Sequence, residues 1–467
     1  MKRAAVINVV GLTRSLVGPA TPRLAEFLRE GASAPVVPAF PAVTCTAQSN
    51  YLTGVTPARH GIVANGWYDR DLAEVHFWKQ SNHLVAAPKI WEQLRQTVPG
   101  FTCAQLFWWH NMYSTADYSI TPRPMYPADG RKVFDIYSWP YSIREEIKRD
   151  LGEFPFATFW GPAAGVSSSQ GGADAASRWI AESAKWIENK YAPTLSLIYL
   201  PHLDYNLQRH GPEAVRTDVF GDLARVDAVA GDLISFFRAR EVRIVLLSEY
   251  GVEAVDRPVH LNRLFRQKGW LTVKEELGLE SLDCGASKVF AVADHQVAHI
   301  YLNDPSLERA ARDVLRNEPG VGSVLGAEEK AARGINHGRA GDLVAVAAEG
   351  AWFTYYYWLE DSRAPDFARC VDIHRKPGFD PVELFLDPKI PLIKLKILWQ
   401  LMRKNLGFRM LLDVIPLDAS LVKGSHGRPV ADPALRPLFA CESAPEPLPD
   451  EIDSTAVCGL IQEQVMG

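Results

Sequence analysis

Short apolar runs alternate with longer amphipathic segments along most of this chain. The first run, residues 4–12 (AAVINVVGL), is rich in β-branched residues and ends at a glycine, as a buried parallel strand does. The following strands are predicted at 101–109, 194–200 and 243–248, and the helices at 89–96, 173–188 and 220–240. This alternation predicts a doubly wound α/β fold with a mostly parallel sheet and helices on both faces.

The pattern changes between Gly251 and His426. There a predicted helix, LERAARDVLRN, lies between the strand-like runs AHIYL and GVGSVL. We expect these residues to form a smaller α+β unit.

Residues 39–69 (AFPAVTCTAQSNYLTGVTPARHGIVANGWYD) carry the most specific chemistry. Taken alone, FPAVTCTAQSNYLTG reads as the capped start of a helix. The whole segment, however, resembles the nucleotide pyrophosphatase/phosphodiesterase branch of the alkaline phosphatase superfamily. The resemblance implies that Thr44 is the nucleophile and that Asn65 binds a phosphoryl oxygen. The signature between them is supplied by Thr53, Gly54, Pro57, His60, Gly61 and Ile62.

These residue types suit attack on phosphorus. A threonine hydroxyl is a poor nucleophile until a metal or a base withdraws its proton. The free N–H groups at a helix N-terminus favour phosphate oxygens, and an amide donor stabilises charge that develops on a non-bridging oxygen.

The resemblance also implies two zinc ions, and the chain keeps only part of their ligand set. Asp204 and His426 match ligand positions, and Glu249 stands where the family has an aspartate. Three further ligand positions hold residues that are poor zinc ligands or none: Val10, Gln208 and Tyr250. We therefore expect a divalent metal, zinc if any, with one ion or none in place of the usual pair.

Other histidines and acids offer alternative sites. His202 and His210 lie near the Gln208 position, and His295 and His299 have a spacing of four. A relocated metal centre could also use Asp372, His374 and Asp380. The alternative for each histidine is an ordinary hydrogen-bonding role.

The resemblance places an inserted cap between the last metal ligands. We place the cap at 253–338 and the alkaline-phosphatase-like core at 1–252 and 339–467, with DLVAVAAE (342–349) returning to the core.

Three functions remain open. The leading one is hydrolysis of a phosphodiester, pyrophosphate or related phosphate-ester bond through a phosphothreonine intermediate. The second is a catalytically impaired, metal-depleted relative that binds a phosphorylated or lipid-like ligand in the same cleft. The third is a metal-independent hydrolase in which His202 or His210 serves as the base for Thr44.

A substrate pocket is predicted beside Thr44. Trp108 and Trp109 in the run LFWWHNMYS, together with Cys45, are candidates to line it, because tryptophan offers a flat apolar face with a polar handle. Ordinary core packing is the alternative for these side chains.

Composition excludes several classes of protein. The chain has 467 residues, of which 47% are hydrophobic, and this suits a large folded enzyme. The net charge of −5 argues against a nucleic-acid polymer as partner. A small phosphorylated substrate is what the resemblance implies. Six scattered cysteines without a C-x-x-C motif suit a cytoplasmic protein.

The apolar N-terminal run reads as a core strand and not as a signal peptide. Neither the substrate nor the oligomeric state follows from the sequence.

Residues 389–417 (KIPLIKLKILWQLMRKNLGFRMLLDVIPL) are apolar but interrupted by lysine and arginine. These charges exclude a membrane-spanning helix. A helix packed on the core with lysines that reach to solvent is the favoured interpretation, and peripheral contact with an anionic membrane is the alternative.

Overall fold

The first strand of the chain lies at the centre of a nine-stranded sheet. The computed structural model describes residues 2–129, 131–164, 172–444 and 446–467. In it, β1 (Ala4–Val9) pairs in parallel with β8 (Leu195–Leu200) on one side and β9 (Arg243–Leu247) on the other. All six residues of β1 are buried, which explains why the strand reads as one continuous apolar run.

The sheet is mostly parallel, with antiparallel pairings toward its edges. Its strand order is β21-β2-β20-β9-β1-β8-β5-β6-β7. The neighbours from β9 to β6 pair in parallel, whereas β20 runs antiparallel to β9 and to β2, and β7 runs antiparallel to β6. The remaining strands are β2 (Ala32–Val37), β5 (Cys103–Leu106), β6 (Tyr118–Pro122), β7 (Ile136–Trp139), β20 (Leu438–Cys441) and β21 (Ile452–Asp453).

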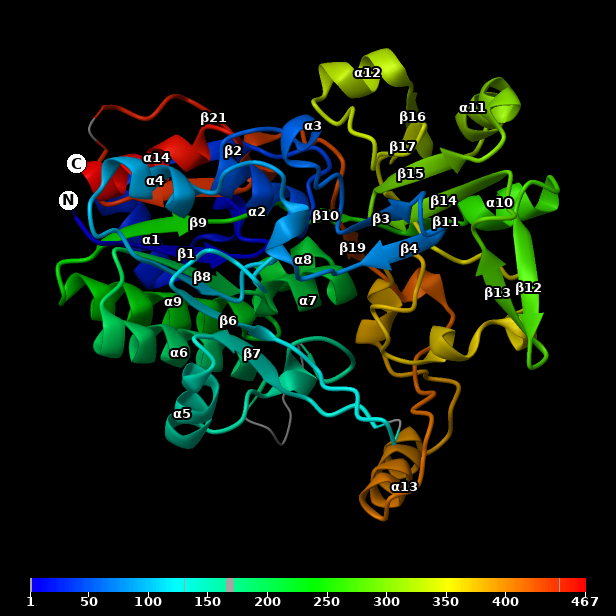
Figure 1. The fold of residues 1–467 in the computed structure, drawn as a ribbon, viewed down its shortest axis with the longest axis horizontal. Coiled ribbons are helices and arrows are strands. Elements are labelled where there is room, and N and C mark those ends of the chain that lie inside the picture. The colour runs from blue at the N-terminus through cyan, green and yellow to red at the C-terminus, as the bar shows by residue number, and fades with distance from the viewer. Residues whose placement is uncertain (1, 130, 165–171, 445) are drawn as a thin grey trace.

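Helices cover both faces of this sheet, as the sequence pattern predicted (Figure 1). On one face α14 (Val457–Met466) packs against α2 (Thr44–Thr53) and α4 (Ile90–Thr97). On the other, α9 (Asp222–Arg238) packs against α1 (Pro22–Glu30) and α6 (Ala175–Tyr191). The outer helix α5 (Ser142–Leu151) and the short helices α3 (Pro57–His60), α7 (His202–His210) and α8 (Pro212–Arg216) complete this body.

A second body is built on a four-stranded antiparallel sheet in the order β14-β15-β17-β16. Its strands are β14 (Val289–Asp294), β15 (Val297–Leu302), β16 (Val321–Leu325) and β17 (Leu343–Ala347). It also holds the hairpin of β12 (Thr272–Glu276) and β13 (Leu279–Asp283), with helices α10 (Leu261–Gln267), α11 (Glu308–Arg316) and α12 (Ala327–Ala332).

Residues 342–349 differ from expectation. They were expected to return to the large sheet, but they form β17, which pairs with β15 and β16. An apolar run indicates that a strand is buried, but it does not indicate which sheet the strand belongs to. The polypeptide returns to the large sheet only at β20.

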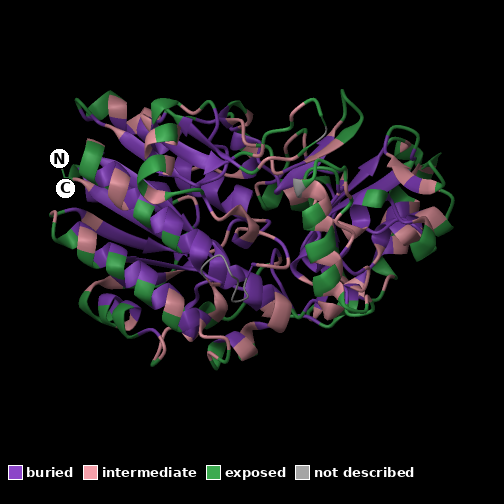
Figure 2. Cartoon of the chain, turned by 90° about the horizontal axis from the view of Figure 1, so that it is seen from below, coloured by how far each residue is buried: buried purple, intermediate pink, exposed green. Residues whose placement is uncertain are grey.

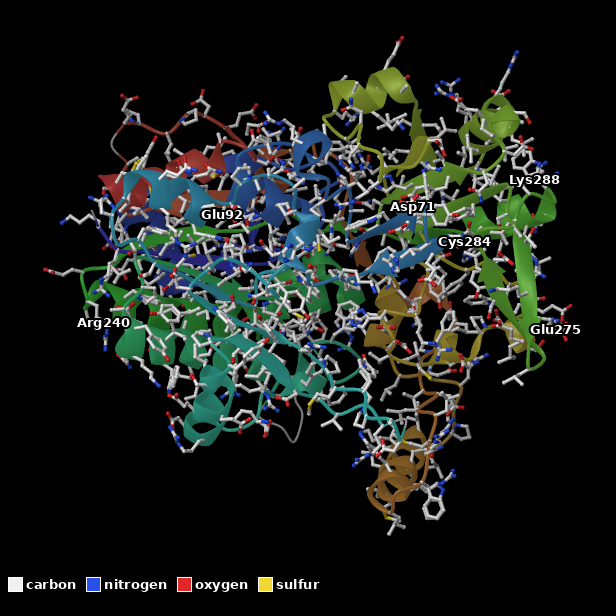
Figure 3. All side chains as sticks on the ribbon, in the orientation of Figure 1. Asp71, Glu92, Arg240, Glu275, Cys284 and Lys288 are labelled. Atoms are coloured by element: carbon white, nitrogen blue, oxygen red, sulfur yellow. The ribbon has the colours of Figure 1, made fainter. Side chains whose placement is uncertain are left out.

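The second body has its own apolar core, visible as a separate buried zone in Figure 2. Most of this core comes from residues between Val255 and Val422, but Tyr68 and Phe77 also belong to it. They lie on the hairpin of β3 (Gly66–Asp69) and β4 (Glu74–Phe77). The polypeptide therefore contributes this hairpin to the second body before it forms the rest of that body. Exposed charged side chains such as Asp71, Glu275 and Lys288 lie on its outside (Figure 3).

Short two-stranded pairings link the segments that leave and re-enter the two bodies. β10 (Glu253–Ala254) pairs with β19 (Gly424–Ser425), and β11 (Arg257–Val259) pairs with β18 (Ala351–Phe353).

The helix predicted within 389–417 forms as α13 (Ile393–Asn405), and it touches the core on one side only, where the half-buried Ile393 and Ile397 pack against the apolar core of the second body. It projects away from both bodies (Figure 1), and none of its described side chains is buried. The prediction of a helix packed on the core therefore holds for one side of α13, whereas its opposite apolar side is exposed. No helix among the described residues is long and apolar enough to cross a membrane.

Candidate functional site

Thr44 is the first residue of α2, beyond the carboxyl ends of the central strands. The preceding Val43 is extended and supplies no side-chain cap, so the first-turn N–H groups are left for other partners. One of them, the N–H of Cys45, donates to Oδ1 of Asn65 at 2.9 Å. Gly54 ends the helix at a φ of 72°, a conformation that glycine adopts without strain.

A chain of hydrogen bonds runs from Thr44 to Asp204. Oγ1 of Thr44 lies 3.3 Å from the hydroxyl of Tyr250, which in turn donates to Oδ1 of Asp204 at 3.5 Å. Nε2 of Gln208 donates to the other carboxylate oxygen at 2.7 Å. Asp204 and Tyr250 follow β8 and β9, the edge where open α/β sheets place their ligands.

Glu249 lies beside this chain and is held by two amides. Nδ2 of Asn8 and Nε2 of Gln48 both donate to its Oε1, each at 2.6 Å. Its Oε2 accepts no hydrogen bond of ordinary geometry from the described residues, although the Thr44 hydroxyl lies near enough to lower the pKa of the carboxyl. Neither amide was predicted from the sequence, in which an asparagine inside the apolar run of β1 was the only signal for one of them.

Burial dominates the ionisation of these groups. It raises the pKa of Glu249 to about 8, against the opposing hydrogen bonds from Gln48 and Asn8. It likewise raises the pKa of Asp204 to about 7, against those from Gln208 and Tyr250. Burial also raises the pKa of Tyr250 well above 10, so its hydroxyl stays protonated.

His426 lies behind Tyr250 and not at the open end of the site. Its ring stacks on Tyr250 with centroids 3.5 Å apart and contacts the His295 ring at 3.7 Å. Nδ1 donates to the carbonyl of Ala42 at 2.7 Å, and Nε2 has no partner among the described residues. Burial lowers the pKa of His426 well below 6.5, so the ring is neutral.

This donor set does not fit a two-zinc centre. Val10 has no ligand atom, Gln208 offers an amide hydrogen to Asp204, and Tyr250 keeps its proton. Within the described ranges, no group of three or more His, Cys, Asp or Glu side chains is placed to hold a metal ion. Hydrogen-bond donors thus occupy both oxygens of Asp204 and Oε1 of Glu249, where a metal site needs free lone pairs.

Asn65 is anchored to the second body. Its backbone N–H and its Nδ2 donate to the two carboxylate oxygens of Asp294, at 2.8 and 3.1 Å. Oδ1 of the same aspartate also lies 2.6 Å from Nδ1 of His295. Asn65 therefore lies close to Thr44, because its Oδ1 accepts from the neighbouring Cys45, and its Nδ2 already gives one hydrogen to Asp294.

The other candidate histidines lie in different places. The structure places neither His202 nor His210 on the cavity beside Thr44, because His202 bonds Ser177 and His210 stacks on Phe220. His299 bonds the backbone at Val63 and Gly341. His295 and His374 do line the cavity, whereas Asp380 pairs with Lys376.

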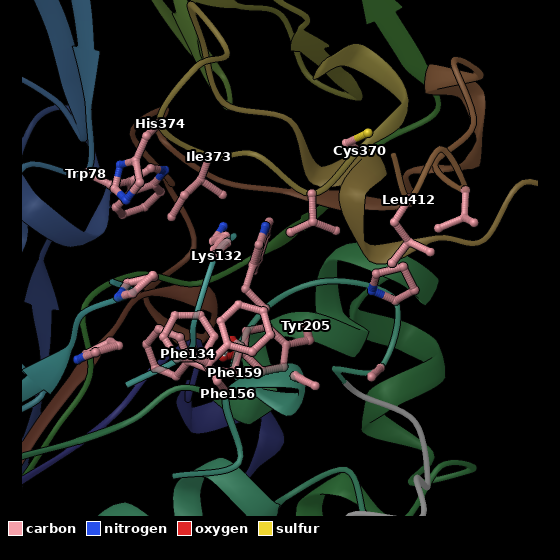
Figure 4. Close-up of a pocket in the computed structure, with 18 of the residues that line it drawn as sticks. Trp78, Lys132, Phe134, Phe156, Phe159, Tyr205, Cys370, Ile373, His374 and Leu412 are labelled. Carbon is pink, nitrogen blue, oxygen red and sulfur yellow. Dashed lines mark hydrogen bonds between the residues drawn. The ribbon is translucent and has the colours of Figure 1, made fainter. Parts of the chain in front are cut away.

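A cavity of about 760 Å³ opens from Thr44 (Figure 4). Tyr250, Asp204 and Gln208 lie at the Thr44 end, and the walls are mainly apolar. The aromatic side chains that line it include Trp78, Trp109, Phe134, Phe156, Phe159, Trp160, Tyr205 and Phe379.

Of the three side chains predicted to line this pocket, the structure places one there. Trp109 lines the cavity and contacts the Trp78 ring at 4.7 Å. Trp108 instead belongs to the apolar core of the large body, and Cys45 belongs to a small apolar cluster that also contains Trp109 and does not line the cavity.

The mostly parallel sheet, the threonine at a helix N-terminus and the acids that follow β8 and β9 define an alkaline-phosphatase-like fold. Residues 4–380 match the family of type I phosphodiesterases and nucleotide pyrophosphatases. The chain belongs to this family of phosphoric ester hydrolases.

Similar proteins agree with this assignment. A pyrophosphatase/phosphodiesterase of Schizosaccharomyces pombe is 23% identical over 259 residues, which are 52% of this chain and 44% of the yeast protein. The match thus spans less than half of that relative.

Solved structures show the same fold at low identity. Murine ectonucleotide pyrophosphatase/phosphodiesterase 5, as an inactive threonine-to-alanine variant with AMP, is 16% identical at a TM-score of 0.58, covering 100% of this chain and 95% of that one. Phosphonoacetate hydrolase from Sinorhizobium meliloti 1021, in complex with phosphonoacetate, is 15% identical at a TM-score of 0.61, covering 99% and 96%.

Proposed function

We propose that this protein hydrolyses a phosphodiester or pyrophosphate bond with Thr44 as the nucleophile, and that it does so without a two-metal centre. The observation that carries the proposal is the hydrogen-bonded chain Thr44–Tyr250–Asp204 at the end of the cavity. It gives the threonine proton a route to a carboxylate, which is what a hydroxyl nucleophile needs when no metal lowers its pKa.

In the first step Oγ1 of Thr44 forms a bond to phosphorus while the bond from phosphorus to the leaving oxygen breaks. The threonine proton passes to the Tyr250 oxygen as the Tyr250 proton passes to Asp204. The leaving oxygen departs and takes a proton from solvent. In the second step water attacks phosphorus and the bond from Thr44 to phosphorus breaks. Thr44 recovers its proton from Asp204 through Tyr250, and the phosphate product releases the proton of the attacking water to solvent.

Glu249 has a different role in this scheme. Because burial raises its pKa to about 8, the carboxyl is mostly protonated at neutral pH and adds no negative charge beside the phosphoryl group. A neutral carboxylic acid can donate a hydrogen bond to a phosphoryl oxygen. The positive end of the α2 dipole favours the same anion.

Two structural neighbours were crystallised with small phosphorylated or phosphonate ligands, AMP and phosphonoacetate. These ligands support a small phosphorylated substrate for the polar end of this cavity.

The second candidate is binding without turnover. The observation that favours it is that amides hold both carboxylates, since Gln208 donates to Asp204, and Asn8 and Gln48 donate to Glu249. A pocket of this kind could hold a phosphorylated or lipid-like ligand with no activated nucleophile.

The test compares the wild type with Thr44→Ala and with Thr46→Ala as a matched control. Thr46 lies on the same helix but bonds the carbonyl of Ile62 and does not line the cavity. We expect the wild type and Thr46→Ala to hydrolyse an aryl phosphodiester in the presence of a chelator, and Thr44→Ala to be inactive. Mass spectrometry of the quenched wild type should find phosphate on Thr44.

Two results would contradict the proposal. Equal inactivity of all three proteins across a panel of aryl phosphodiesters and dinucleotide pyrophosphates favours binding alone. Activity that a chelator abolishes and zinc restores contradicts the metal-independent mechanism while leaving Thr44 as the nucleophile.

A further inference from the structure

The segment 389–412, which contains α13, differs from the rest of the surface. Twenty large hydrophobic side chains are exposed among the described residues, and nine of them lie in this segment. They are Leu392, Leu395, Leu398, Trp399, Leu401, Met402, Leu406, Phe408 and Leu411. Soluble monomers rarely gather so many exposed apolar side chains in one place unless a partner covers them.

The helix has two apolar faces with different environments. Ile397, Leu401 and Lys404 line the cavity that begins at Thr44. A second stripe, spaced at i, i+3, i+4 and i+7, contributes no residue to the cavity lining and consists of Leu395, Leu398, Trp399 and Met402. A helix that only closed the cavity would need one apolar face, so the second stripe requires its own explanation.

The charges of the segment all have one sign. Residues 389–412 contain no acidic side chain, although the whole chain has a net charge of −5. The basic residues are Lys389, Lys394, Lys396, Arg403, Lys404 and Arg409. Lys396 pairs with Asp413 at 2.8 Å, and the other five form no ion pair within the described part of the chain. A partner with negative charge complements this segment.

Residues 123–129 and 131–134 extend the same surface toward the cavity mouth and approach α13 in Figure 1. Nζ of Lys404 lies 6.0 Å from the centroid of the Phe134 ring, and both residues line the cavity. Met125 and Tyr126 are also exposed. The apolar surface outside the protein is thus continuous with the apolar wall inside it.

We propose that segment 389–412 docks in the interface of an anionic lipid bilayer, and that the cavity takes up the hydrocarbon chain of an amphiphilic phosphoric ester from that bilayer. The second half of this proposal rests on the proposed function. A helix of 13 residues is about 20 Å long and cannot cross a hydrocarbon core of about 30 Å. A basic helix with an outward apolar stripe lies in the bilayer plane instead.

This orientation indicates which part of the ligand each end of the cavity binds. Thr44, Asp204 and Tyr250 at one end suit the phosphoric ester, and the apolar side chains between them and α13 suit a hydrocarbon chain. The hydrocarbon chain would pass beside Ile397 and Leu401 between the bilayer and the cavity.

The first experiment measures binding of the full chain to sedimented phosphatidylcholine vesicles with and without phosphatidylglycerol. We expect binding that requires phosphatidylglycerol and weakens with salt, a loss of binding in the double variant Leu398→Glu/Trp399→Glu, and about fivefold weaker binding in Lys394→Gln. The matched control is Leu277→Glu, which places the same charge at a fully exposed leucine in the β12–β13 turn and should bind like the wild type.

Several outcomes would overturn docking. Docking is contradicted if the wild type binds to neither kind of vesicle. It is also contradicted if the double variant binds as tightly as the wild type. The same holds for a dimer that the double variant dissociates in the absence of lipid, because a second copy of the chain would then be the occupant of this surface. Unchanged circular dichroism and melting temperature in the variants show that the fold is intact.

The second experiment uses two aryl phosphodiesters that differ only in their second ester, hexadecyl or methyl. In the double variant we expect hydrolysis of the hexadecyl ester in phosphatidylglycerol vesicles to fall by about tenfold or more, the order expected from loss of one buried apolar anchor. Hydrolysis of the methyl ester in solution should be unchanged. If the wild type hydrolysed the hexadecyl and the methyl ester at equal rates, the proposed uptake of the hydrocarbon chain would be contradicted. If vesicle binding holds but the wild type cleaves neither ester, the proposed function fails and chain uptake fails with it.

Discussion

At the scale of single residues, the site is organised around a tyrosine hydroxyl. Tyr250 stands where the family resemblance implies a metal-binding histidine, and its oxygen lies between Thr44 and Asp204. The ring itself is fixed by stacking on His426. The hydroxyl can therefore be removed with little change to the packing around it.

The substitution Tyr250→Phe tests the proton route. We expect kcat to fall by about 10²- to 10⁴-fold, the usual contribution of general base catalysis, while substrate binding and the melting temperature stay close to wild type. Steady-state kinetics on an aryl phosphodiester and differential scanning calorimetry measure these quantities. An unchanged kcat would show that the threonine proton leaves by another route.

Buried carboxyls predict how stability depends on pH. Burial raises the pKa of Asp204 to about 7, of Glu249 to about 8 and of Asp294 to about 6, so the folded protein keeps protons that the unfolded chain loses near pH 4. Stability should therefore be greatest below about pH 4 as far as these groups are concerned, and should be lost as pH rises toward 8.

The expected slope is at most about 1.4 kcal/mol per pH unit for each group that is protonated only in the folded state. Melting temperatures measured from pH 5 to pH 9 check this slope. Glu249→Gln keeps an acceptor for Asn8 and Gln48 but cannot titrate, so its profile should be flatter above pH 6. A wild-type melting temperature that rises over the same range would contradict the assignment.

The sequence predicted the key residues unevenly. Thr44 and Asp204 could be placed because each stands in a recognisable segment next to a strand or helix end. Gln48 and Asn8 could not, because their importance depends on Glu249, which lies 201 and 241 positions away. Asp294 was missed for the same reason, since it meets Asn65 across 229 positions.

At the scale of elements, the end of β9 is positioned by close packing around one glycine. A Cβ atom on Gly251 would lie 1.8 Å from the carbonyl oxygen of Leu435 and 2.9 Å from Cγ2 of Thr13. No side chain fits there, and Gly251 directly follows Tyr250.

We expect Gly251→Ala to destabilise the protein by about 1–3 kcal/mol and to lower kcat by displacing Tyr250. Gly459→Ala is the matched control, because a Cβ at this position of α14 meets no atom within 4 Å. Alanine within a helix should stabilise that variant by about 0.5–1 kcal/mol. Chemical denaturation compares the two, and equal stability would contradict the packing argument.

The elements themselves were largely predictable. Helices α6 and α9 and strands β8 and β9 lie where apolar periodicity placed them, because each buries one face or both. One element was assigned to the wrong sheet, and the exposed apolar side of another was not expected. The apolar sequence of β17 does not indicate which of the two sheets the strand joins. Helix α13 has the composition of a helix that is packed on a core, although its outer apolar stripe is exposed.

At the scale of the whole molecule, the two bodies meet at the candidate site. Asn65 lies close to Thr44, and Asp294 ends β14 in the second body, so their two hydrogen bonds join the bodies beside Thr44.

The substitution Asp294→Asn tests this junction. It places an amide group where two donors of Asn65 need two acceptors, so one buried donor loses its partner. We expect a loss of stability of about 1–3 kcal/mol and faster hydrogen exchange in residues 64–69. Asp283→Asn, in β13 of the same body, is the control. Unchanged exchange at residues 64–69 would mean that this contact does not hold the bodies together.

The central position of β1 also has a consequence for biosynthesis. The strand is made before both of its partners, since β8 begins 186 positions and β9 begins 234 positions after Val9. Until then its two hydrogen-bonding edges have no native partner, and an unpaired apolar edge invites wrong pairing with other chains. A nascent chain that ends before residue 195 therefore cannot complete its sheet, and its yield in cells should depend on chaperones that shield the first strand.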